Sequence, residues 1–212
     1  MKKMFFALLL ISTISNAQYR FRYDKLFMEA GMGMAIPLSG ISPSGDGNGS
    51  ISLIHLQGGL RYMFTENVGL LGNLNFDQFE DSNHQKSEQK MASLELCYNL
   101  GNLIDISRNT GGQFGLLAHA GAGLGTMDSK YVTKRDYIEA ILIGVKPYVF
   151  INEKVSLFGD LTYKATLAQD TYFNGVTTTY PSPGQFSASQ LGITFGFIVA
   201  LGQNRFHADS AY

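Results

Sequence analysis

The sequence predicts an all-β protein, an eight-stranded antiparallel transmembrane β-barrel. Three observations lead to this prediction: segments in which apolar residues alternate with small or polar ones, an export signal at the N-terminus, and connections that are alternately long and short. The clearest segment is 191–202, with Leu191, Ile193, Phe195, Phe197, Val199 and Leu201 on one face and Gly192, Thr194, Gly196 and Ala200 on the other. A two-residue period is that of a strand, and the apolar face carries no charge.

The N-terminus, residues 1–17, has the features of a secretory signal peptide. Lys2 and Lys3 precede an apolar run, and the small residues Ser15 and Ala17 stand before an expected cleavage site at Gln18. No cysteine follows the apolar run, which argues against a lipoprotein. We therefore expect an exported protein with a barrel domain at 18–202 and a short periplasmic tail at 203–212.

Composition narrows the function classes. A formal net charge of −1 argues against nucleic acid as a partner. Cys97 is the single cysteine, so an intramolecular disulfide and a cysteine-based metal cluster are both excluded. No motif for a cofactor or a metal is present, and we expect neither.

Four strands are predicted in the first half of the chain, at 26–36, 51–64, 68–78 and 91–100. Their apolar faces consist of Leu26, Met28, Ala30, Met32, Ile36; Ile54, Leu56, Leu60, Tyr62, Phe64; Val68, Leu70, Leu74, Phe76; and Leu94, Leu96, Tyr98, Leu100. The opposite faces hold Phe27, Glu29, Gly31, Gly33; His55, Gln57, Gly59, Arg61; Asn73, Asn75, Asp77; and Ser93, Glu95, Cys97, Asn99. Lengths of ~9–11 residues fit strands that cross a bilayer at a tilt.

Four more strands are predicted at 114–125, 138–150, 155–165 and 191–202. In the sixth strand Glu139 and Lys146 have opposite parity, so both cannot face inward without a bulge. We place Lys146 inside and Glu139 at the outer rim. The seventh strand sets Val155, Leu157, Leu161 and Tyr163 against Ser156, Asp160, Thr162 and Lys164.

The connections alternate in length. Long polar loops are expected at 37–50, 79–90, 126–135 and 166–189, and tight turns at 65–67 and 152–154. This asymmetry is expected of an outer-membrane barrel whose termini are both periplasmic. The exception is 101–113, a longer stretch where a short turn should be. Aromatic rings at the short-turn ends suit an interfacial belt, and they are Tyr62, Phe64, Tyr98, Phe114, Tyr148 and Phe150.

A soluble lipid-binding barrel is the alternative fold. Its outward faces would meet water and would normally carry many Lys and Glu residues. The polar faces of this chain are mostly Gly, Asn, Ser and Thr, which favours the membrane barrel.

The chain resembles the OmpA-like small outer-membrane barrels over residues 24–202. The resemblance is most specific in FGLLAHAGAGLG (114–125), in VKPYVFINEKVSLFGDLTY (145–163) and in the closing strand. It implies a barrel in the outer membrane of a Gram-negative bacterium. Members of this family often carry a periplasmic peptidoglycan-binding domain after the barrel, and 203–212 is too short to hold one.

The interior of an eight-stranded barrel is just wide enough to be filled by side chains. Six charged residues should therefore meet inside it, and they are Glu29, Arg61, Glu95, Lys146, Asp160 and Lys164. A structural ion-pair network is the favoured interpretation, and a gate or small-ion path is the alternative.

A histidine-based enzyme site is a weaker candidate. Some small barrels modify lipid A with a His, a Ser and an acidic residue near the outer rim. In this chain only His55, with the serines and Asp46 of the first loop, offers such an arrangement, whereas His84 and His207 lie in a loop and in the tail.

The fifth strand has unusually small outward residues. If Leu117 and His119 face inward, Ala118, Ala120 and Ala122 face lipid and form a shallow strip. Small residues let another surface approach closely inside a membrane. The strip is a possible docking site for a partner barrel, a membrane helix or a bound lipid, unless alanine merely tolerates lipid there.

We therefore predict a non-enzymatic structural or accessory subunit of an envelope assembly, surrounded by outer-membrane lipid, with another envelope protein as its candidate partner. The alternative is a surface adhesin or ligand-binding protein that acts through the long loops. A lipid A-modifying enzyme and a small diffusion pore are less favoured.

Overall fold

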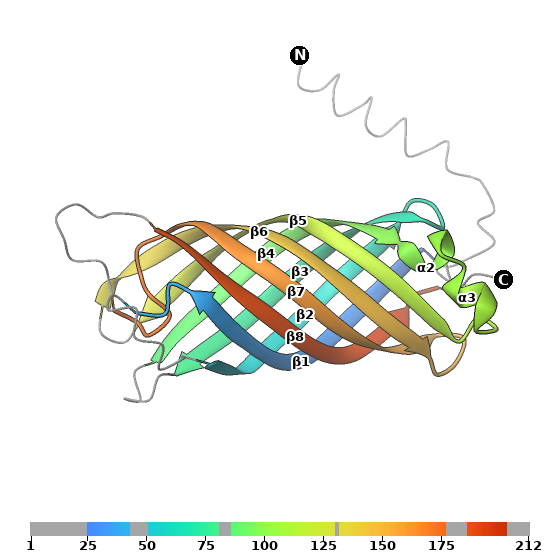
Figure 1. Ribbon diagram of the computed structural model, residues 1–212, viewed down its shortest axis with the longest axis horizontal. Coiled ribbons are helices and arrows are strands. Elements are labelled where there is room, and N and C mark those ends of the chain that lie inside the picture. The colour runs from blue at the N-terminus through green and yellow to red at the C-terminus, as the bar shows by residue number, and fades with distance from the viewer. Residues whose placement is uncertain (1–24, 43–50, 81–85, 130–131, 177–185, 203–212) are drawn as a thin grey trace, which may run out of the picture.

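The structure is a closed barrel of eight antiparallel strands in which each strand pairs with its neighbours in chain order and β1 closes on β8 (Figure 1). The computed structural model describes residues 25–42, 51–80, 86–129, 132–176 and 186–202. The strands are β1 (Leu26–Ser39), β2 (Ile51–Met63), β3 (Val68–Glu80), β4 (Lys86–Asn99), β5 (Phe114–Ser129), β6 (Val132–Phe150), β7 (Val155–Gln169) and β8 (Phe186–Ala200). The predicted fold class is confirmed.

Side chains alternate between the barrel interior and the outer wall. On the outer wall large apolar side chains are exposed, with Met32 at 67% and Leu74 and Leu124 at 68%. Inward residues include many buried polar side chains, such as Glu29 and Arg61. An apolar outside around a polar inside is the arrangement of a barrel that faces lipid. No helix in the described ranges is long and apolar enough to cross a membrane.

Several strands are longer than the sequence predicts, so the expected loops are shorter. The expected loop 126–135 is mostly strand, because β5 continues to Ser129 and β6 begins at Val132. Likewise β4 begins at Lys86 and β8 at Phe186. Backbone pairing continues in these extensions although their outward residues become charged, because this part of the wall lies beyond the apolar band. The hydropathy pattern therefore ends before the strand does.

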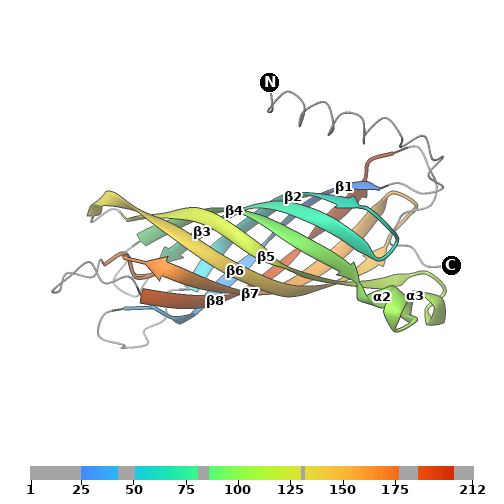
Figure 2. The ribbon, with the colours of Figure 1, turned by 90° about the horizontal axis from the view of Figure 1, so that it is seen from above.

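The opposite end of the barrel has the expected short turns, at 64–67 between β2 and β3 and at 151–154 between β6 and β7. The longer connection holds two short helices, α2 (Leu100–Leu103) and α3 (Ile106–Asn109), side by side at the barrel rim (Figure 2). The Asn99 side chain caps α2 by accepting a hydrogen bond from the Asn102 backbone N–H at 3.2 Å. Leu100, expected on the fourth strand, is the first residue of α2.

The parity of β6 is as predicted, with Lys146 buried inside and Glu139 exposed on the outer wall. The strand alternates without interruption, and the irregularity lies on its neighbour. Glu139 pairs with Ala168 but Ala140 pairs with Thr166, so Leu167 is an extra residue in β7. Such a bulge reverses the parity of the rest of β7.

Two members of the expected aromatic belt, Tyr148 and Phe150, are wrong. Tyr148 has the parity of Lys146 and points into the barrel, where it is 3% exposed. Phe150 beside it is partly buried, with ring centroids 5.4 Å apart. The other four rings, Tyr62, Phe64, Tyr98 and Phe114, lie on the outer wall as expected.

The signal peptide, the tail, Asp46, His84 and His207 lie outside the described residues.

Candidate functional site

The barrel interior has two apolar ends and a polar middle. The cluster nearest the short turns consists of Phe27, Met63, Leu117, Tyr148, Phe158, Ile198 and Ala200. The cluster at the opposite end consists of Ala35, Phe79, Met91, Met127, Ile138, Ala140, Leu142, Phe173 and Ala188. Charged and amide side chains occupy the length between these clusters.

Glu29 is the centre of the first ion-pair group. Its carboxylate accepts hydrogen bonds from Nε of Arg61 at 2.7 Å and from Nζ of Lys146 at 2.5 Å. Lys146 also lies 3.3 Å from Oδ2 of Asp160. The Arg61 guanidinium stands over the Phe27 ring at 4.3 Å, so the apolar end also contacts the charge. This group joins β1, β2, β6 and β7 across the barrel.

His119 connects the first group to Glu95. Its Nε2 lies 3.1 Å from Oδ1 of Asp160 and its Nδ1 lies 2.5 Å from Oε2 of Glu95. A neutral imidazole carries one N–H, and a carboxylate carries none. For both contacts to be hydrogen bonds, the triad of His119, Glu95 and Asp160 must hold one proton more than a neutral imidazole with two ionised carboxylates. Ser93 and Asn73 also donate to Glu95, at 2.6 and 3.3 Å.

A second group is built around Asp77. Its Oδ1 lies 2.5 Å from Nδ1 of His55, and its Oδ2 accepts from Nζ of Lys164 at 3.2 Å. Lys164 also donates to Gln89 at 2.9 Å. The amide of Gln190 donates to both Gln89 and Asp77. These contacts join β2, β3, β4, β7 and β8.

All six predicted interior charges lie inside the barrel, but they do not form a single set. Glu29, Arg61, Lys146 and Asp160 contact one another directly, Glu95 joins them only through His119, and Lys164 belongs to the second group. Asp77, His55 and His119 are essential members that the predicted network omits. Their inward parity was recognisable, but their partners on distant strands were not. The charges support the structural network, because each faces a partner.

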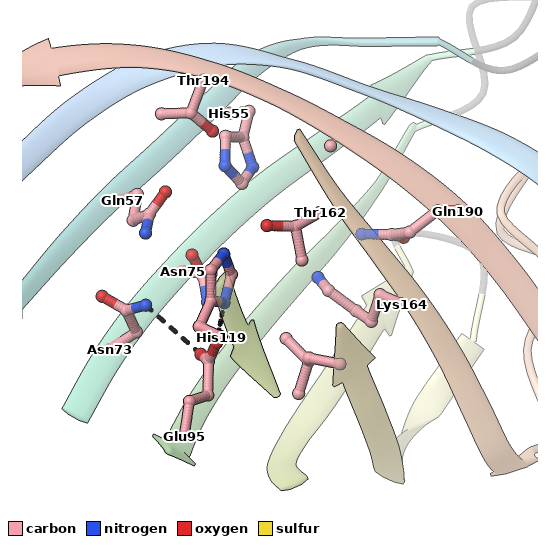
Figure 3. A pocket seen from close by; sticks show the side chains of 12 residues that line it. His55, Gln57, Asn73, Asn75, Glu95, His119, Thr162, Lys164, Gln190 and Thr194 are labelled. Carbon is pink, nitrogen blue, oxygen red and sulfur yellow. Dashed lines mark hydrogen bonds and ion pairs between the residues drawn. The ribbon is translucent and has the colours of Figure 1, made fainter. Parts of the chain in front are cut away.

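A small polar cavity lies between the two groups (Figure 3). His55, Asn73, His119 and Lys164 are among the residues that line it, and its volume is about 20 Å³. Oδ1 of Asn73 and Oε1 of Gln190 are buried without a hydrogen-bond partner. A cavity of this size with unsatisfied polar atoms fits one buried water molecule. No group of three or more described His, Cys, Asp or Glu residues is arranged to hold a metal ion.

The segment after β7 closes the barrel end opposite the short turns. Phe173 is fully buried and packs on Phe79 with ring centroids 4.7 Å apart. Its backbone N–H donates to the Gly40 carbonyl at 3.0 Å. Asp136 accepts hydrogen bonds from the backbone N–H groups of residues 170 and 171, at 2.7 and 2.8 Å. The segment is thus tied to β6 and to the residue that follows β1, and Phe173 completes the apolar cluster at this end.

The histidine-based enzyme arrangement finds no support in the described residues. His55 is buried inside the barrel and engaged with Asp77. Ser52, the nearest serine on its strand, donates instead to the carbonyl of Ile54 at 2.9 Å. Asp46 lies outside the described residues.

The alanine strip runs along β5 between two ridges of the outer wall. Ala118, Ala120 and Ala122 pair with Tyr98, Leu96 and Leu94 of β4 and with Val145, Ile143 and Ile141 of β6. The flanking side chains are large and exposed, with Leu96 at 62% and Ile143 at 59%. The strip is therefore a trough one strand wide.

Solved structures match this chain over most of its length. Neisserial surface protein A (NspA) matches with a TM-score of 0.59 and 11% identity, over 83% of this chain and 97% of that one. The N-terminal β-barrel domain of Pseudomonas aeruginosa OprF matches with a TM-score of 0.48 and 15% identity, over 83% and 98%. Ail, the attachment invasion locus protein of Yersinia pestis, has a TM-score of 0.44 and 12% identity, over 83% and 99%.

The fold is that of a small outer-membrane β-barrel. The resemblance predicted from the sequence is thus confirmed for the fold. No protein-family model and no curated protein matches the chain. At 11% identity the likeness to NspA identifies the architecture alone. The function must therefore be argued from the interior and the outer wall of this chain.

Proposed function

We propose that this protein is a non-enzymatic barrel of a Gram-negative outer membrane and serves as a structural or accessory subunit of an envelope assembly. The observation that carries the proposal is the closure of the interior at both ends. Apolar clusters around Phe158 at one end and Phe173 at the other enclose ion-paired side chains. A barrel that is filled in this way has its outer surfaces left for interaction.

The trough on β5 supports a role as a subunit. Lipid-facing residues of most strands are large, whereas Ala118 and Ala120 follow each other outward on β5. Helices in a membrane associate through close packing at small residues. Lipid tails are as apolar as the side chains, so the hydrophobic effect does not drive the helices together. We extend the same physics to a barrel wall. The ridges at Leu96 and Ile143 would fit on either side of a partner's side chains.

The test is site-specific photo-crosslinking in intact cells, with the probe at Ala120. We expect a stoichiometric envelope protein to be captured, and we expect Ala120→Phe to abolish the capture while the barrel still folds. Gly58→Phe is the matched control, because Gly58 is on β2 and an added Cβ there meets nothing within 4 Å. Capture that survives Ala120→Phe, or lipid as the only adduct, would contradict the proposal.

A ligand-binding role at the loop end is the second candidate. The specific observation is that β5 and β6 continue past the apolar band with charged outward side chains. Arg135 donates to Asp128 at 2.8 Å, and Tyr137 between them and the lipid is 73% exposed. Replacing residues 127–136, the end of the β5–β6 hairpin beyond the Thr126–Tyr137 pair, with a short turn should then abolish cell-surface binding. The subunit role instead predicts that crosslinking at Ala120 is unchanged by this replacement.

A further inference from the structure

A groove lies at the outer end of the β5 strip, on the lipid-facing wall. It has a volume of about 550 Å³ and is lined by residues of β4, β5, β6 and β7. Its floor is formed by small residues, Ala92, Ala122 and Gly123, and its walls by Leu94, Leu124, Ile141 and Leu167. The bulge in β7 places Leu167 at this wall, where the side chain is 53% exposed.

Glu139 is the single acidic residue that lines this apolar groove. It is exposed and makes no hydrogen bond or ion pair in the described part of the chain. It pairs across the sheet with Leu124 on one side and Ala168 on the other, so its direct neighbours offer no charge. An unpaired carboxylate beside apolar walls is complementary to a cation that arrives with an apolar partner.

Glu139 also marks a level in the membrane. Moving along β6 from the short-turn end, the outward residues Val145, Ile143 and Ile141 are apolar, and beyond Glu139 they are Tyr137 and Arg135. The apolar band of the wall therefore ends at Glu139. We expect lipid headgroups at the level where the apolar band ends. The groove extends from Glu139 toward Ala122, within the apolar band.

The basic residues nearby do not neutralise Glu139. Lys90 is 3.2 Å from Glu88 and 3.9 Å from Asp128, and Arg135 pairs with Asp128 at 2.8 Å. Together with Glu139, these side chains lie on the outward faces of three adjacent strands. The acidic ones are Glu88, Asp128 and Glu139, and they outnumber the basic Lys90 and Arg135. The groove mouth therefore attracts a positive group from outside the chain.

We propose that this groove binds one membrane lipid with an ammonium-bearing headgroup. One acyl chain lies over Ala122 and Gly123, and the ammonium group donates to the Glu139 carboxylate. The volume of about 550 Å³ falls within the ~300–1,000 Å³ typical of sites for single small molecules, and a transmembrane segment of a partner would contact a longer surface. This inference goes beyond the subunit role and does not depend on it.

The experiment is native mass spectrometry of the purified barrel titrated with lipids that share the same acyl chains. Phosphatidylethanolamine carries a primary ammonium, phosphatidylcholine a quaternary one without N–H, and phosphatidylglycerol none. We expect one phosphatidylethanolamine to bind about tenfold more tightly than phosphatidylglycerol, as a charge-assisted hydrogen bond provides, and more tightly than phosphatidylcholine. Glu139→Gln should abolish this preference.

Glu88→Gln is the matched control, since it neutralises a carboxylate on the same face that is already paired with Lys90. It should leave the preference unchanged. Ala122→Phe should fill the groove and remove binding of all three lipids, and heat-dependent gel mobility verifies that each variant is folded. Equal affinity of the wild type for the three lipids overturns the proposal, as does a preference that survives Glu139→Gln. A photo-crosslinker at Ala122 that captures protein instead of lipid also overturns it, whatever the probe at Ala120 captures.

Discussion

The imidazole of His119 lies against Gly144, its cross-strand partner on β6. A Cβ on Gly144 would collide with Nε2 of His119 and would come 2.8 Å from Oγ1 of Thr162. The missing side chain therefore creates the space from which His119 reaches Asp160 on the next strand. A glycine on one strand thus determines an ion-pair contact between two others.

Replacing this glycine should disturb the network. We expect Gly144→Ala to displace the His119 ring from Asp160 and to lower the free energy of unfolding by about 1–3 kcal/mol, the usual effect of overpacking. Urea unfolding in detergent micelles measures the change. Gly58→Ala on the outer wall is the control and should be nearly neutral, because its Cβ would meet no atom within 4 Å. Equal stability of the two variants would refute this account of Gly144.

The proton held by the His119 triad can be observed directly. If the imidazole donates to both Glu95 and Asp160, nitrogen NMR at neutral pH should show two protonated ring nitrogens for His119. His119→Gln offers one donor group and one acceptor oxygen, so one carboxylate should lose its partner and the barrel should unfold at lower urea. Spectra of a single neutral tautomer, with no acidic proton on either carboxyl group, would contradict the second proton.

The buried ion pair of Arg61 and the exposed ion pair of Arg135 should contribute very differently to the free energy of unfolding. Arg61 and Glu29 are fully buried, so Arg61→Ala leaves a carboxylate with Lys146 as its remaining ion-pair partner and should destabilise the barrel by ~3–5 kcal/mol. Arg135 pairs with Asp128 at the exposed rim, where the side chain of Arg135 is 59% exposed. Arg135→Ala should leave the unfolding midpoint almost unchanged, because water and salt screen an exposed ion pair. Similar unfolding midpoints for the two variants would indicate that Arg61 is hydrated.

The sequence was sufficient for the fold and for the side of the wall on which most residues lie. Alternation of apolar and polar residues reports the difference between lipid and barrel interior, and it placed Glu29, Arg61 and Lys146 correctly. Alternation did not predict that Tyr148 points inward, because an aromatic ring near a strand end is compatible both with an interfacial belt and with an apolar cluster inside the barrel. Parity with Lys146 two residues earlier was the evidence that placed it inside.

The remaining differences also have physical reasons. The pairing of Lys164 with Asp77 joins residues 87 positions apart, and barrel closure decides it, whereas alternation within one strand does not report it. The strands extend past the expected loops because hydropathy reports only the part that lies in lipid. The inward position of Phe173 was not predicted for a related reason. The stretch 166–189 has the composition of one polar loop, and nothing in the local sequence indicates that Phe173 turns inward.

The closure at Phe173 makes a prediction about conductance. The wild-type protein should show no steady single-channel conductance in planar bilayers, because apolar clusters seal the interior at both ends. Phe173→Ala removes one seal and should cost about 3–5 kcal/mol of stability, as expected for truncation of a buried phenylalanine. It should still not conduct, since Phe158 and its neighbours close the other end. What should change is access from outside: a soluble paramagnetic agent should broaden the ring signals of His55 in the variant but not in the wild type. Steady conductance from either protein would show that the interior side chains leave a continuous path.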